Sequence, residues 1–88
     1  MNEKKRAKPD PPQTLTEAGE ALARMRPAQA APLADWLAYY QQWAALYAEV
    51  AEIDRGHHHE CLAFMEYGQE CAKDIKAEIA AQRPAGDQ

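Results

Sequence analysis

The chain of 88 residues contains no serine, only four glycines, and no long uninterrupted run of apolar residues. The lack of serine excludes a serine nucleophile, and four scattered glycines leave no glycine-rich loop to hold a phosphate. No apolar run reaches the ~18 residues that a membrane-spanning helix requires. No apolar segment follows the basic start of the chain, as it would in a signal peptide, so we expect a cytoplasmic protein without a membrane anchor.

Cysteine is also scarce: Cys61 and Cys71 are the only two. On one straight helix their spacing places them about 15 Å apart, whereas the Cα atoms of a disulfide lie within about 7 Å of each other. We therefore expect two free thiols that act as small apolar side chains. Because no recognisable catalytic constellation is present, we expect neither enzymatic activity nor a small-molecule substrate.

The residues that are abundant favour helices. Apolar residues make up 47% of the chain, many of them alanine, while valine, isoleucine and threonine are few, which argues against strands. The net charge is −4; four basic and two acidic residues between positions 1 and 13 give +2, so residues 14–88 sum to −6. Since an acidic body is repelled by the phosphates of DNA, we do not expect a nucleic-acid partner.

Hydrophobic periodicity and the positions of proline predict a three-helix domain over residues 14–83. The expected helices span residues 15–26, 33–54 and 58–82. Thr14 and Glu17 have the spacing of a capping box, in which each side chain accepts a hydrogen bond from the other's backbone N–H. Pro27 then ends the first helix, because the residue before a proline avoids the α conformation.

The two ends of the chain lack apolar anchors, and we expect residues 1–13 and 84–88 to be disordered. The first of these segments is a basic arm with four cationic side chains, Lys4, Lys5, Arg6 and Lys8. Such an arm supplies one alternative function, that of an accessory protein that binds nucleic acid through the arm rather than through the acidic body.

The join between the second and third expected helices admits two arrangements. One continuous helix over residues 33–82 would be about 75 Å long and would have to pair with another copy as a coiled coil. A turn at residues 54–57 gives an antiparallel hairpin instead, and Gly56 suits the left-handed position that often ends a helix. We favour the hairpin, so the expected fold is all-α: a short N-terminal helix and an antiparallel helical hairpin that form a small bundle.

Aromatic residues recur at helical spacing and form a stripe along the hairpin. The stripe consists of Trp36, Tyr40, Trp43, Tyr47 and, on the third helix, Phe64. Gly68 follows Phe64 on the same face and predicts that another helix passes close to it. The spacing is typical of a buried seam, yet one short helix cannot cover so much apolar surface. We therefore predict a protein-interaction or regulatory module that binds a partner protein, or a second copy as a dimer, through this stripe.

The run of three histidines at positions 57–59, followed by glutamate and cysteine, has two interpretations. His57 and Cys61 share one helical face, and with His58 they could provide part of a zinc site. Glu60 could add a carboxylate, but structural zinc usually takes four ligands and Cys71 lies too far along the helix. A complete site would need a dimer, or His58 and His59 turned inward together. The simpler interpretation has the histidines bond free backbone groups or Asp54 at a helix start. We expect no cofactor, with zinc- or pH-responsive regulation as the alternative.

Two resemblances involve this part of the chain. The stretch "YAEVAEIDRGHHHECLAF" looks like the join between two helices of tetratricopeptide-type units, although no repeat of about 34 residues recurs. The stretches "TLTEAGEAL" and "PLADWLAYYQQWAALYAEVAEIDRGHHHE" resemble a group of short actinobacterial helical proteins of unknown function that share a His-His-His-Glu segment. This second resemblance covers residues 14 to about 75, and it implies no activity.

Overall fold

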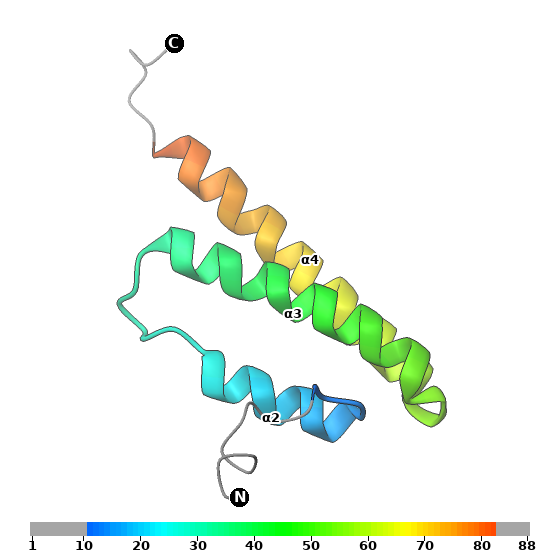
Figure 1. Ribbon diagram of the computed structural model, residues 1–88. Helices are drawn as coiled ribbons and strands as arrows, with labels where there is room; N and C mark the ends of the chain where they lie inside the picture. Colours follow the sequence, from blue (N-terminus) through cyan, green and yellow to red (C-terminus); the bar gives the residue numbers. More distant parts are fainter. Residues whose placement is uncertain (1–10, 83–88) are drawn as a thin grey trace, which may run out of the picture.

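The structure, a computed structural model, describes residues 11–82 and contains three α-helices. These are α2 (Leu15–Met25), α3 (Leu33–Ile53) and α4 (His58–Ala81), with a short 3-10 turn, η1 (Arg55–His57), between the last two. Figure 1 shows α3 and α4 side by side and antiparallel, with α2 packed against α3. The predicted all-α hairpin is confirmed, and each helix ends within one residue of its expected boundary.

Several sequence-based expectations fall outside the part of the chain that the structure describes. They include the basic arm, with Lys4, Lys5, Arg6 and Lys8, and the tail at residues 84–88. Within residues 11–82, no helix is both long enough and apolar enough to cross a lipid bilayer.

The start of α2 is fixed by hydrogen bonds from both local and distant residues. The Glu17 N–H donates to Thr14 Oγ1 at 3.1 Å, as the capping-box spacing predicts. The Glu17 carboxylate, however, accepts from the N–H of Gln13 at 2.9 Å rather than from that of Thr14, so half of the capping box was predicted wrongly. The free N–H of Leu15 donates to Asp54 Oδ2 at 2.9 Å, which ties α2 to the end of α3.

The chain reverses at η1 without a left-handed residue. No glycine among the described residues has a positive φ, so the prediction that Gly56 adopts the left-handed helix-ending position was wrong. Instead, the helical bonding of α3 ends at Asp54, whose backbone (φ −93°, ψ 75°) leaves the helical region. The 3-10 turn that follows needs only negative φ values, because it continues the right-handed sense of the helices.

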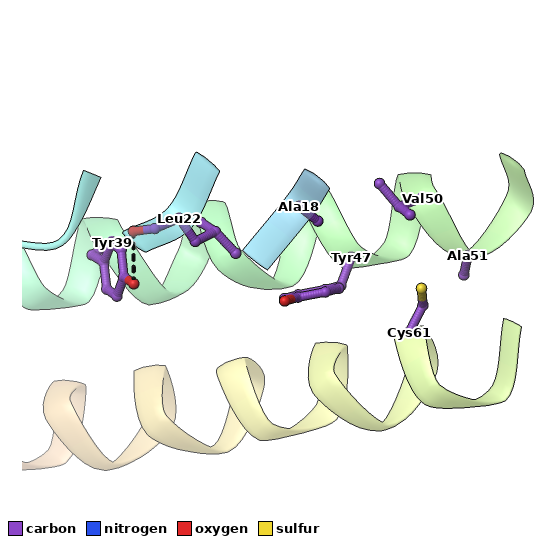
Figure 2. Close-up of a cluster of buried hydrophobic side chains, with 7 residues drawn as sticks. All are labelled: Ala18, Leu22, Tyr39, Tyr47, Val50, Ala51 and Cys61. Carbon is purple, nitrogen blue, oxygen red and sulfur yellow. Dashed lines mark hydrogen bonds between the residues drawn. The ribbon is translucent and has the colours of Figure 1, made fainter. Parts of the chain in front are cut away.

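The core lies where α2, α3 and the first turns of α4 meet. Figure 2 shows its seven buried members: Ala18, Leu22, Tyr39, Tyr47, Val50, Ala51 and Cys61. The Cys61 thiol points from α4 toward α3, and the Tyr39 hydroxyl donates to the Leu22 carbonyl of α2 at 3.0 Å. Because alanine and cysteine are small, the helices approach one another closely at this end.

Farther along the hairpin, Gly68 brings α4 close to α3. A Cβ atom at this position would lie 2.5 Å from Trp43 Cδ1 and 3.2 Å from the Tyr40 carbonyl oxygen. Both separations are shorter than an ordinary van der Waals contact, so a side chain at position 68 would push the helices apart. The predicted close approach at Gly68 is confirmed.

Candidate interaction surface

The aromatic rings gather on one flank of the α3–α4 hairpin, the flank on which α2 lies. We call this surface the aromatic groove, and it consists of Trp36, Trp43, Tyr47, Phe64 and Tyr67. The rings of Tyr47 and Phe64 stack with their centroids 5.1 Å apart, and the Trp43 ring lies 5.5 Å from that of Tyr67. Rings from α3 therefore continue without interruption onto rings from α4.

Trp43 is held at the centre of the groove by two features of α4. Its indole occupies the space that the missing side chain of Gly68 leaves open. Its Nε1–H donates to the Phe64 carbonyl oxygen at 2.7 Å, which satisfies the one polar group of the ring. Shape and hydrogen bonding thus fix the position of this ring.

On its other side, the groove deepens toward α2. A hollow of about 230 Å³ lies there, bounded on α2 by Gly19, Ala23 and Arg26 and on α3 by Trp43 and Tyr47. A Cβ atom on Gly19 would lie 3.6 Å from the Tyr47 hydroxyl, an ordinary van der Waals contact.

The Arg26 side chain lies over the Trp36 ring at one end of the groove. The Arg26 guanidinium carbon stands 5.3 Å from the centre of the Trp36 ring. This distance is within the range of a cation–π interaction, which is worth about 0.5–1 kcal/mol at an exposed site.

The predicted stripe divides into buried and accessible members. Tyr47 belongs to the core, and Trp36, Tyr40 and Trp43 are half-buried against it. Phe64 is 42% exposed and Tyr67, which was left out of the predicted stripe, is 52% exposed. Its spacing of three residues from Phe64 was the sequence signal that could have placed Tyr67 on this surface.

The tyrosine hydroxyls at the groove and beside it are neutral. Burial raises the pKa of Tyr39 and of Tyr47, which keeps their hydroxyls neutral and poorly suited to act as bases or nucleophiles. The Tyr39 hydroxyl is already used in the bond to the Leu22 carbonyl. The groove therefore offers aromatic faces and neutral hydroxyls to a partner.

We call the opposite flank of the hairpin the polar flank, because it carries Gln41, Gln69, Lys73 and Lys76. A hollow of about 310 Å³ on this flank is lined by these four side chains together with Tyr40, Ala44 and Ala72. Tyr40 lies between the flanks, since it lines this hollow and also contacts the Tyr67 ring at 6.2 Å. The two lysines of α4 thus lie on the side of the hairpin away from Phe64, with Tyr40 between the two flanks.

The turn end of the hairpin holds the histidines. His57 Nδ1 lies 2.9 Å from Asp54 Oδ2, the oxygen that also accepts from Leu15 N–H. Both bonds stabilise the carboxylate and lower the pKa of Asp54, the Leu15 bond more than the His57 bond. The expected pairing of a histidine with Asp54 is confirmed, and it joins α2 to the turn.

The three residues proposed as zinc ligands do not converge. His58 Nδ1 lies 2.8 Å from the Ala51 carbonyl oxygen and 3.2 Å from Arg55 Nη1, so this nitrogen is engaged within the chain. Cys61 is fully buried, and burial raises the pKa of its thiol, which disfavours the thiolate that binds metal. Within residues 11–82, no group of three His, Cys, Asp or Glu side chains is placed to hold a metal ion.

Comparisons of the chain with models of protein families, with curated proteins and with solved structures found no match. Function is therefore inferred from the aromatic groove and from the charges beside it.

Proposed function

We propose that the chain is a non-catalytic protein-interaction module that takes a helix of a partner protein into the aromatic groove. The observation that carries this proposal is the exposure of Phe64 and Tyr67 directly beside the half-buried Trp43. Clustered aromatic side chains with one accessible face are typical of the residues that dominate the energy of protein–protein interfaces.

The shape of the surface favours a helix as the occupant. The groove runs along α3, with α2 on one side and the Phe64 and Tyr67 edge of α4 on the other. An additional helix can pack in such a groove by inserting side chains spaced three and four residues apart between the rings. Because Trp43 is already fixed by its bond to Phe64, little side-chain freedom is lost on binding.

The proposal is tested by comparing what wild-type and variant chains retain from an extract of the native host. The test variant is Phe64→Ala with Tyr67→Ala. The control is Ile53→Ala, because Ile53 is similarly exposed, at 48%, but lies outside the groove. We expect a protein that wild type and the control both retain and that the double variant loses by at least about tenfold.

Two results would count against the proposal. One is retention that the double variant leaves unchanged, since the groove would then be irrelevant to binding. The other is that the purified chain forms a dimer in sedimentation velocity, the double variant abolishes that dimer, and no other protein is retained. The groove would in that case be occupied by a second copy.

A further inference from the structure

The charges beside the aromatic groove restrict the kind of helix that it can take. Along α4, Glu60, Tyr67, Asp74 and Glu78 follow one another at intervals of seven, seven and four residues. Since seven residues make almost two full helical turns, these four side chains share one edge of the helix. The three carboxylates are exposed, so they extend the edge that Tyr67 presents to the groove.

Basic side chains of α4 lie elsewhere. Among the described residues of α4, the two lysines are Lys73 and Lys76, and both line the hollow on the opposite, polar flank. Among the residues that line the hollow between α2 and α3, the cation is Arg26, which is engaged with the Trp36 ring. The α4 edge of the groove is therefore negative over most of its length.

From this charge pattern we infer that the partner segment is a basic amphipathic helix. Its apolar side chains, three and four residues apart, fill the aromatic groove, and lysines or arginines on its adjoining face lie along Glu60, Asp74 and Glu78. A second copy of this chain is a poorer occupant, because each copy carries a net charge of −4. This inference depends on the proposed function and adds the chemistry of the partner to it.

Two model peptides test the inference. Both are helical and carry leucine at positions three and four residues apart; one has lysine and the other glutamate at the remaining exposed positions. Binding is followed through the fluorescence of Trp36 and Trp43. At low salt we expect the lysine peptide to bind about tenfold more tightly than the glutamate peptide, from three exposed ion pairs, and this preference should shrink as salt is added.

Matched charge variants locate the effect. Neutralising the edge with Glu60→Gln, Asp74→Asn and Glu78→Gln should remove most of the preference for the lysine peptide. Neutralising the polar flank with Lys73→Gln and Lys76→Gln should leave the preference in place. All five side chains are exposed, so each variant is expected to keep its helical circular dichroism spectrum.

The possible outcomes separate this inference from the proposed function. Equal binding of both peptides, or a preference that survives neutralisation of the acidic edge, would overturn the inference that the partner helix is basic. The proposal that the groove binds a helix would still stand. Failure of both peptides to bind would overturn the two proposals together. Binding of the lysine peptide that Phe64→Ala does not weaken would show attraction to the acidic surface alone, and it too would overturn the inference.

Discussion

The two flanks of the α3–α4 hairpin are built from the same helices but meet different surroundings. One flank presents Trp43, Phe64 and Tyr67 and is partly covered by α2, whereas the other presents Gln41 and Lys73 and is left open. An apolar flank needs a cover, because leaving aromatic surface in water is unfavourable, and a polar flank does not. With only 11 residues, α2 covers the α3 side of the apolar flank and leaves the α4 side available.

Among the substitutions that test the role of α2 as the cover of the apolar flank, Leu22→Ala should have the largest effect on the free energy of unfolding. Leu22 is 1% exposed and is the largest buried side chain that α2 contributes to the core. Its truncation should lower the free energy of unfolding by about 2–5 kcal/mol, which is a large share for a domain of this size. Urea unfolding followed by circular dichroism measures the change.

The matched control for Leu22→Ala lies on the polar flank. Gln69→Ala removes an exposed side chain of α4, and we expect the free energy of unfolding to change by no more than about 0.5 kcal/mol. Similar losses in the two variants would show that α2 does not stabilise the apolar flank in the manner described.

A smaller effect is expected from Gly68→Ala. A helical alanine is favoured over glycine by about 1 kcal/mol, but the new Cβ would lie 2.5 Å from Trp43 Cδ1 and 3.2 Å from the Tyr40 carbonyl. Crowding of this kind costs about 1–3 kcal/mol, so we expect a net loss of about 1 kcal/mol in the free energy of unfolding. The displaced Trp43 should also emit at a longer wavelength.

Gly56→Ala provides the control for this change. A Cβ atom at Gly56 meets no atom within 4 Å, and its φ is not positive. We therefore expect alanine at position 56 to leave the protein as stable as before or to stabilise it by up to about 1 kcal/mol. A Gly68→Ala chain as stable as Gly56→Ala would mean that Trp43 does not depend on the missing side chain.

We expect the smallest effect on the free energy of unfolding from Asp54→Asn. This change keeps an acceptor oxygen for the Leu15 N–H but removes the charge. Hydrogen bonds from Leu15 and His57 lower the pKa of Asp54 below its usual value of 3.8, so the folded state favours the carboxylate. The stabilisation is therefore complete above the unfolded pKa and is lost as the pH falls through the lower, folded pKa. We expect wild type to be the more stable at about pH 7, and the difference to vanish in strong acid.

Urea unfolding at a series of pH values measures this difference. Glu49→Gln is the control, because Glu49 is an exposed carboxylate of α3 away from the turn. If the gap between wild type and Asp54→Asn stayed constant across the acid range, charge on Asp54 would not be what ties α2 to the turn.

The helices could be predicted because their signals are local. Pro27 ends the first helix, apolar residues recur every three or four positions, and Gly68 interrupts a stripe of larger side chains. The proline and the apolar spacing act through the backbone or through neighbours one turn away, and Gly68 stands out because glycine is rare on an apolar helix face. The helical spacing of the aromatic stripe is likewise a local signal, and it placed the α3 rings on one face of that helix.

The remaining features depend on contacts between distant residues. The Leu15–Asp54 hydrogen bond joins positions 39 apart, and no local pattern indicates it. Gly56 was misassigned because glycine permits a left-handed conformation without requiring it. Whether Tyr47 or Phe64 would be buried depended on where α2 lies, which helix periodicity does not specify.

The Leu15–Asp54 bond also has a consequence for the order in which the chain folds. An isolated helix of 11 residues is marginal in water, and the first N–H of α2 is satisfied only after α3 has ended at Asp54. We therefore expect α2 to become stable only when it packs against α3 and Asp54 accepts from Leu15. In the native state we expect the same dependence to make α2 the helix that opens at the lowest free-energy cost, so that its amide hydrogens exchange with solvent faster than those of α3 and α4.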